Sequence, residues 1–334
     1  MRLFFTRVAL ALMVAGAAYA PSQAGTITFG SGGNTFNMEF VTIGNPGNAA
    51  DTDANAQPLN AGAVGYSYDI GKFEVSEDMI EKYNANFGTA NSLAITKDAR
   101  GTAKPATSVS WNEAARFVNW LNTSTGNQAA YKFTTSGVND NIDVWTSGDA
   151  GYDVNNKYRN SLAKYVLPSY NEWYKAAYYD PNTSAYYDYT TGSDSAPTAV
   201  ASGTGTGANG NNEAVYDFQS GPADVTQAGG FSPYGVMGLG GNASEWEESS
   251  GDLANSSGPS NRGYRGGNWF LGPYNLSSSS RYSGNGPSNE GYNIGFRVAS
   301  LSPSAPPAVP EPSMMVIGTL FGLGGLMAKR RRKK

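Results

Sequence analysis

The sequence predicts an α+β fold that is irregular and loop-rich, with a few capped helices set among short strands. Three observations carry this prediction. Two Ser-x-x-Glu capping boxes precede amphipathic runs, several short segments alternate apolar and polar residues, and 42 glycines punctuate the stretches between them. With 334 residues, the chain can form one large domain or two small ones.

The first elements are expected to be strands. Residues 25–30 and 36–44 alternate in polarity, and residues 63–76 indicate a further strand pair. Ser76 can then cap a helix that continues to Phe87. The apolar residues that share one face of this helix are Met79, Ile80, Tyr83 and Phe87.

The clearest helices begin at the two capping boxes. Ser110 with Glu113 opens the first helix, and Ser169 with Glu172 opens the second. Apolar residues then recur at helical spacing; they are Trp111, Ala114, Ala115, Val118 and Leu121 in the first helix, and Tyr170, Trp173, Ala176 and Ala177 in the second. Pro181 is expected to end the second helix, and both apolar stripes are expected to face the core.

The second half of the chain carries fewer regular signals. Residues 190–212 and 249–261 are turn-rich. Loops of this length in a compact domain tend to be either functional or poorly ordered. Residues 263–270 and 291–300 are strand-like, so the domain is expected to end in strands.

The composition excludes several kinds of catalysis. The chain has no cysteine and no histidine, so it can form no disulfide, thiolate nucleophile or thiolate-bound metal. The commonest general base is also missing, which rules out Ser-His-Asp and Cys-His mechanisms. Any metal would have to be a hard cation held by oxygen, and acid–base chemistry would rest on Asp, Glu, Lys or Tyr.

Residues 1–24 have the pattern of a secretory signal peptide. Arg2 and Arg7 precede an apolar run, and small residues follow it. We expect cleavage after Ala24, because cleavage after Ala20 would leave a proline at the next position. A buried N-terminal helix is the alternative interpretation.

The other end of the chain carries a second sorting pattern. After an extended linker at 301–309, residues 310–334 combine Pro-Glu-Pro, an apolar run at 314–328 and six basic residues at 329–334. This arrangement closely resembles the PEP-CTERM sorting signal. The resemblance implies an envelope with an outer membrane, processing by exosortase-type machinery, and delivery to the cell surface, outer membrane or extracellular matrix. The apolar helix would contact the membrane only before processing, and an ordinary tail anchor is the alternative.

The charge of the body argues against nucleic-acid partners. Without the signal and tail, 15 basic and 26 acidic residues remain, a net charge of about −11. Such a body repels nucleic acid and anionic membranes. It suits cation binding and solubility outside the cell.

Six stretches occur in an order that resembles the formylglycine-generating, or sulfatase-modifying factor, family. They are YDIGKFEVS at 68–76, PATSVSWNEAARFVNWLN at 105–122, YVLPSYNEWYKAAYYDP at 165–181, YGVMGLGGNASEW at 234–246, YRGGNW at 264–269, and SSSSRYS with NIGFRVAS within 277–300. Residues 25–300 are therefore predicted to form one domain of this kind. The resemblance implies a fold similar to that of C-type lectins.

The resemblance also implies where catalytic residues would lie. Active members of the family oxidise a cysteine of a sulfatase. For this they use a pair of their own cysteines, which bind copper. The first would stand at Leu271 and the second within 274–276, where this chain has Tyr274, Asn275 and Leu276. Copper(I) prefers thiolates, so no copper is expected and no catalytic residue is assigned. The family's iron-dependent chemistry uses histidines, which are also absent.

A structural calcium is implied at residues 238–246. The resemblance assigns its ligands to Gly238, Gly241, Ala243 and Glu245, with a carboxylate from the last and main-chain carbonyls from the others. Glycines allow carbonyls to converge, and calcium takes about six to eight oxygens. Gly238 stands where the family usually has Asp or Asn. The alternative is a glycine-rich tight turn in which Glu245 pairs with an arginine.

Three arginines leave a further choice open. Arg265, Arg281 and Arg297 lie in family-like segments of an acidic body. They could pair with acidic residues in the core, or they could line a cleft that captures a carboxylate or sulfate.

Two classes of function follow from these observations. The first is a non-catalytic binding or structural module outside the cell, whose Gly-, Ser- and aromatic-rich loops suit saccharide or peptide surfaces and whose partners would be exopolysaccharide or envelope proteins. The second is an enzyme, built either on Asp, Glu, Tyr or Lys or on an unknown ligand set for formylglycine generation. The expected cofactor is calcium, as a structural ion.

Overall fold

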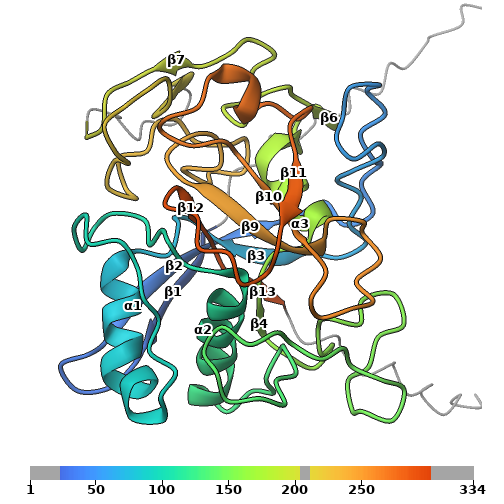
Figure 1. Ribbon diagram of the computed structural model, residues 1–334. Coiled ribbons are helices and arrows are strands. Elements are labelled where there is room, and N and C mark those ends of the chain that lie inside the picture. Colours follow the sequence, from blue (N-terminus) through green and yellow to red (C-terminus); the bar gives the residue numbers. More distant parts are fainter. Residues whose placement is uncertain (1–22, 204–210, 302–334) are drawn as a thin grey trace, which may run out of the picture. The chain divides into compact units, whose positions relative to one another are not determined.

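The computed structural model describes residues 23–203 and 211–301, and it confirms a mixed α+β fold in which short elements are joined by long loops (Figure 1). The α-helices in the described part are α1 (Glu77–Tyr83), α2 (Trp111–Ser124) and α3 (Tyr170–Tyr178). The shorter helical turns are the π-helical η1 (Asn84–Gly88) and the 3-10 turns η2 (Thr89–Asn91) and η3 (Pro273–Leu276).

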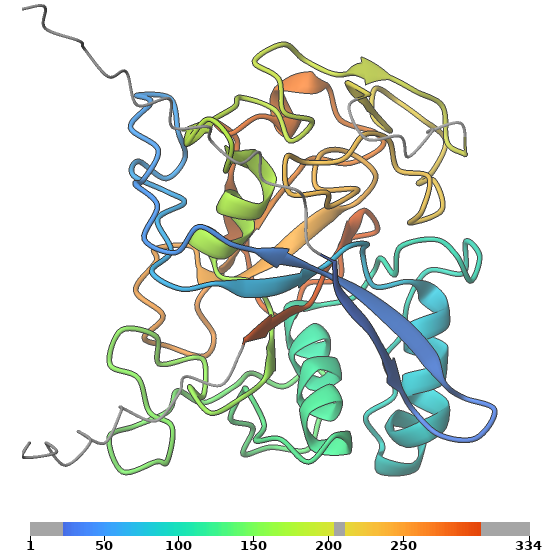
Figure 2. The same cartoon turned by 180° about the vertical axis from the view of Figure 1, so that it is seen from behind.

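The larger sheet has five antiparallel strands in the order β1, β2, β3, β13, β4. Their bounds are β1 (Gln23–Phe29), β2 (Phe36–Ile43), β3 (Tyr68–Gly71), β13 (Ala299–Leu301) and β4 (Tyr165–Val166). Because β13 lies between β3 and β4, the last described residues form an interior strand of this sheet (Figure 1). The β1–β2 hairpin lies beside α1 (Figure 2).

The second sheet has four strands in the order β11, β10, β9, β12. Their bounds are β11 (Tyr282–Asn285), β10 (Arg262–Arg265), β9 (Ser244–Ser250) and β12 (Ile294–Gly295). Strand β9 pairs antiparallel with β10 and parallel with β12. The small pairs are β5 (Tyr179–Asp180) with β6 (Ala185–Tyr186), and β7 (Thr198–Ala199) with β8 (Glu213–Ala214).

Both predicted capping boxes are present. Ser110 Oγ accepts from the Glu113 amide at 3.1 Å, while Glu113 Oε2 accepts from the Ser110 amide at 2.9 Å. Ser169 and Glu172 make the same reciprocal pair at the start of α3. These bonds satisfy amides that the first helical turn leaves without partners, and they direct the apolar stripes of α2 and α3 into the core.

Two local expectations were wrong in detail. Residues 63–76 hold one strand, β3, instead of two. Val75 instead bonds to the main chain of Phe296 and of Ala106, outside any named strand. Helix α3 ends at Tyr178, before Pro181, because the next residues turn into the extended β5 and pair with β6.

The largest difference concerns β9. Its sequence SEWEESS lies across two stretches that were expected to be loops, yet all seven residues are buried. Each of its three glutamates contacts a guanidinium; the pairs are Glu245 with Arg297, Glu247 with Arg265 and Arg281, and Glu248 with Arg159. The interpretation of Arg265, Arg281 and Arg297 as core ion-pair partners is therefore confirmed.

Arg297 connects the two sheets. Its Nε donates to Glu245 Oε2 on β9 at 2.6 Å, and its Nη1 donates to the carbonyl of Gly71 on β3 at 2.8 Å. A third bond reaches the carbonyl of Met237 at 2.9 Å. The side chain is fully buried, so the interaction is formed without competing water.

A fourth buried glutamate, Glu74, lies close to this pair. Its carboxylate accepts from Asn242 Nδ2 at 2.7 Å and from the Ala243 amide at 3.1 Å. Burial, and next the charge of Glu245, raise the pKa of Glu74 to about 8. Glu74 therefore keeps its proton in the folded protein under conditions where an exposed glutamate has lost it.

The predicted end segments lie outside the described residues, apart from their inner margins. This applies to the signal peptide at 1–24, the linker at 301–309 and the sorting tail at 310–334. Within 23–203 and 211–301, no helix combines the length and apolar character that a membrane crossing requires.

Replacement of Arg297 by methionine should lower the free energy of unfolding by about 3–5 kcal/mol, because it leaves the Glu245 carboxylate buried without its cation. Urea denaturation followed by tryptophan fluorescence measures the change. Lys82→Met is the matched control: it breaks an exposed pair with Asp78 on α1 and should lower the free energy by less than about 1 kcal/mol. Equal effects from the two variants would contradict the role given to Arg297.

The raised pKa of Glu74 predicts a pH dependence of stability. The unfolded carboxyl ionises near its ordinary value of 4.5, whereas the folded one ionises at about 8. The contribution of this group is therefore fully present below pH 4.5 and is lost as the pH rises to 8. Urea denaturation between pH 5 and 9 should give a flatter profile for Glu74→Gln than for the wild type. The half-exposed Glu81 provides the control Glu81→Gln, and parallel profiles for wild type and Glu74→Gln would refute the assignment.

Candidate functional site

The residues predicted to hold calcium lie in a tight turn that leads into β9. Gly238 and Gly241 have positive φ angles of 75° and 86°, which side chains adopt rarely. A Cβ on Gly241 would come within 2.6 Å of the Val215 carbonyl oxygen. Main-chain bonds from Gly241 to Gly266 and from Asn242 to Val215 hold the turn closed.

The donor set of this turn fits a guanidinium better than a calcium ion. Both oxygens of Glu245 bind Arg297, and Glu245 Oε2 also accepts from Trp173 Nε1 at 2.7 Å. The described residues contain no group of three or more acidic side chains that could hold a metal. A cation bound to Glu245 would have to displace Arg297, so calcium at Gly238, Gly241, Ala243 and Glu245 stays a prediction.

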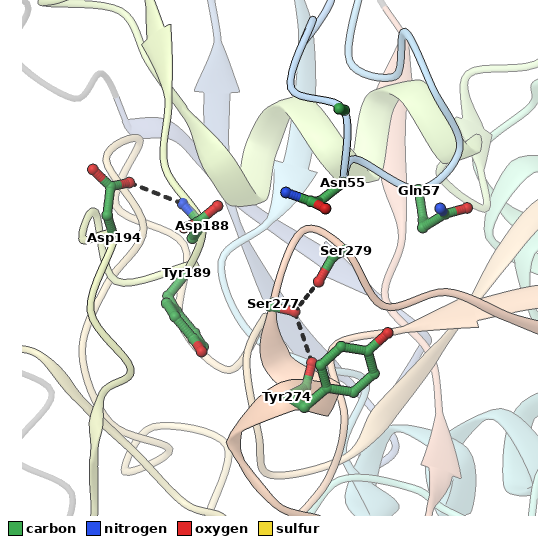
Figure 3. A pocket seen from close by; sticks show the side chains of 9 residues that line it. Asn55, Gln57, Asp188, Tyr189, Asp194, Tyr274, Ser277 and Ser279 are labelled. Atoms are coloured by element: carbon green, nitrogen blue, oxygen red, sulfur yellow. Dashed lines mark hydrogen bonds between the residues drawn. The ribbon is translucent and has the colours of Figure 1, made fainter.

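The positions implied for the family's cysteines lie on a loop and on η3. Leu271 is half-buried, and its carbonyl accepts from the amide of Asp217 at 2.9 Å. On η3, Leu276 is buried whereas Tyr274 is 66% exposed. The exposed ring of Tyr274 faces an open pocket in the adjoining surface (Figure 3).

This pocket, called the polar pocket below, encloses about 390 Å³. Three separate segments supply its walls, at 54–57, 188–194 and 274–279 (Figure 3). The lining residues are Ala54, Asn55, Gln57, Asp188, Tyr189, Asp194, Tyr274, Ser277 and Ser279. Amides, hydroxyls, carboxylates and aromatic rings therefore meet in one space.

Main-chain bonds join the three walls. The Gln57 amide donates to the Ser278 carbonyl at 3.2 Å, and the Ser278 amide donates to the Asp188 carbonyl at 2.8 Å. Ser277 Oγ lies 2.8 Å from Ser279 Oγ and donates to the Tyr274 carbonyl at 2.7 Å (Figure 3). The lining side chains thus project from a backbone frame that is fixed before any ligand binds.

Helix α3 supports this backbone frame through hydrogen bonds from two of its tyrosines. Tyr174 donates its hydroxyl to Asp51 Oδ2 at 2.6 Å, just before the first wall. Tyr178, one helical turn later, donates to the carbonyl of Leu276 at 3.1 Å, in the third wall. Both tyrosines are fully buried, so the capped helix sets the spacing of the two walls.

The polar pocket is acidic. Partial burial raises the pKa of Asp188, and the charges of Asp194, Asp53 and Asp51 raise it further. Among the described residues, no lysine or arginine lines the pocket. A carboxylate in such surroundings favours a proton or a cationic ligand.

The sequence did not indicate this pocket. Each of its walls is short and turn-like, and only Asp194 fell within a loop that its length marked as functional. Residues 51–62, which include Asn55 and Gln57, begin like a calcium-binding loop but lack its glycine and its final glutamate. The family resemblance was a weak signal, because it placed the family's catalytic cysteines at 271 and within 274–276.

The comparisons with known proteins agree with this architecture. No protein of curated function matches the sequence. Among solved structures, Treponema denticola variable protein 1 aligns with a TM-score of 0.54 at 20% identity, covering 82% of this chain and 98% of that one. CarF aligns with a TM-score of 0.55 at 19% identity, covering 79% and 98%. At these identities the likeness establishes the fold alone.

A weaker structural match is PvdO from Pseudomonas aeruginosa, with a TM-score of 0.47 at 18% identity, covering 85% of this chain and all of that one. The sequence itself gives the decisive comparison. The family profile described as Sulfatase-modifying factor enzyme 1-like domain matches residues 24–301. The match covers most of the chain, including both sheets and the polar pocket, and the chain therefore belongs to the family of sulfatase-modifying factor enzyme 1-like domains.

Proposed function

We propose that this chain is a non-catalytic binding module of the sulfatase-modifying factor family, and that the polar pocket is its binding surface. One observation carries the proposal: the pocket borders the segment where the family's cysteines would stand, yet apart from Ala54 its lining consists of amides, hydroxyls, carboxylates and tyrosine rings. These groups recognise polar ligands through hydrogen bonds and stacking.

The chemistry of the chain supports a role without redox catalysis. A copper(I) centre needs soft ligands, and 334 residues provide no cysteine and no histidine. Leu271 and Leu276 cannot donate to a metal through their side chains. The fold does not depend on thiols at these positions, because its buried ion pairs do not involve the side chains of Leu271 and Leu276.

The setting proposed for this module is outside the inner membrane. The signal pattern at 1–24 and the sorting pattern at 310–334 support export, processing by exosortase-type machinery and display at the cell surface or in the matrix. The partners in that setting would be exopolysaccharide or envelope proteins. The acidic body supports solubility there and disfavours binding to nucleic acid.

Binding to matrix material tests the proposal directly. The full chain, purified in mild detergent, should be retained on at least one immobilised exopolysaccharide or envelope protein. Tyr274→Ala should weaken that retention about threefold to tenfold, because it removes an exposed ring from the pocket wall. Tyr292→Ala removes a ring of similar exposure outside the lining and should have no effect. If the chain is retained on none of the polymers and proteins tried, the proposed binding function is contradicted.

A second candidate function is an enzyme of altered chemistry. It is favoured by Asp188 and Asp194, which bring two carboxylates to one pocket, and by the raised pKa of Asp188, which suits a proton donor. Such an enzyme would release product from a polymer substrate, and Asp188→Asn or Asp194→Asn would abolish the release. Reducing-end assays on the polymers that bind distinguish the two functions.

Formylglycine generation should be absent. When the full chain is incubated with a cysteine-containing sulfatase peptide, copper and oxygen, mass spectrometry should detect no aldehyde and an oxygen electrode no added consumption, because no thiolate can hold the copper. A cysteine-bearing family member is the positive control. Aldehyde formation by this chain would overturn the non-catalytic assignment.

A further inference from the structure

Two groups of acidic residues in this chain differ in their partners. The three glutamates of β9 each contact an arginine at the centre of the domain. Four aspartates at or beside the polar pocket form no ion pair within the described residues; they are Asp51, Asp53, Asp188 and Asp194. The carboxylates of β9 are thus neutralised by arginines, whereas no cation of the described residues pairs with the pocket carboxylates.

The described arginines that lie closest in sequence to the polar pocket already have a carboxylate partner. The arginines nearest in sequence to its third wall are Arg265 and Arg281. Both are held by Glu247, and Arg265 also donates to the Ser280 carbonyl at 2.9 Å. A cationic group of a ligand would therefore supply the positive charge that the described residues do not place beside Asp188 and Asp194.

The other lining groups favour a ligand rich in hydroxyls. The side chains of Asn55 and Gln57 and the hydroxyls of Tyr189 and Tyr274 form no hydrogen bond within the described residues, and Figure 3 shows these groups around the same space as Asp188 and Asp194. Side-chain amides pair with neighbouring hydroxyls by donating and accepting at once. The exposed face of Tyr274 offers a surface for the apolar face of a sugar ring.

Building on the proposed binding function, we propose that the polar pocket takes a saccharide that carries a protonated amine, such as a unit of a deacetylated amino-sugar polymer. The aspartates bind the ammonium group, the amides and tyrosine hydroxyls bind the ring hydroxyls, and Tyr274 stacks on the ring. A lysine-rich peptide would satisfy the charge but not the amide and hydroxyl groups. Acidic polysaccharides are repelled by the pocket and by a body of about −11 net charge.

Calorimetric titration of the full chain with three matched oligosaccharides tests this ligand class. The probes are a glucosamine pentamer, an N-acetylglucosamine pentamer and cellopentaose. The glucosamine pentamer should bind at least tenfold more tightly than either neutral probe, since an ammonium–carboxylate hydrogen bond is among the strong ones. Its affinity should fall as salt is raised from 50 to 500 mM, whereas any neutral binding should not.

Two variants locate the effect. Asp188→Asn and Asp194→Asn retain side-chain shape but remove charge, and each should weaken glucosamine pentamer binding about tenfold. Asp143→Asn makes the same change at an exposed position on another loop and should leave the affinity unchanged. Unaltered melting temperatures for all three variants would confirm that each one is folded.

The outcomes separate this inference from the proposed function. Equal affinity for all three pentamers, with no effect of Asp188→Asn and Asp194→Asn, would overturn the amine requirement while leaving a saccharide-binding module. Binding of an oligolysine peptide but of no saccharide would overturn the ligand class. Failure to bind every probe, together with no retention on matrix polymers or envelope proteins, would overturn both.

Discussion

The burial of three carboxylates on β9 is the constraint on which the rest of this structure depends. A carboxylate in the interior is tolerated only if a cation and hydrogen bonds replace its water. The four arginines that meet this need come from distant parts of the chain, at 159, 265, 281 and 297. The domain must therefore bring these segments together at one strand. A shift of the β9 register by one residue would turn each glutamate to the other face of the sheet, away from its arginine.

The same ion pairs position the polar pocket. Glu247 holds Arg265 and Arg281, and Arg265 donates to the carbonyl of Ser280, directly after the wall at 274–279. A second support comes from α3, whose buried Tyr174 and Tyr178 bond to Asp51, just before the first wall, and to Leu276 in the third. A pocket held in this way loses little conformational entropy on binding, which favours affinity for a small polar ligand.

The sequence predicted those features that depend on neighbouring residues. Ser110 and Ser169 marked their helices because a capping box lies within four positions of the chain. The sequence also left two interpretations of Arg297 open: an ion pair in the core, or a cleft that binds an anion. It could not reveal β9, because the glutamates at 245, 247 and 248 break the apolar pattern of a buried strand. Nor could it reveal the pocket, whose walls are joined by main-chain bonds between residues far apart in the sequence, such as Gln57 and Ser278.

Stability and surface chemistry lie on different residues in this domain. The ion pairs, the capping boxes and the aromatic core stabilise the fold, whereas the half-buried Leu271 lies on a loop and the exposed Tyr274 on a short helical turn. Exchange of side chains at such positions changes what the surface can bind while leaving the buried network intact. A fold of this family can therefore exist without the thiols of a copper site, because none of its buried ion pairs depends on the residues at those positions.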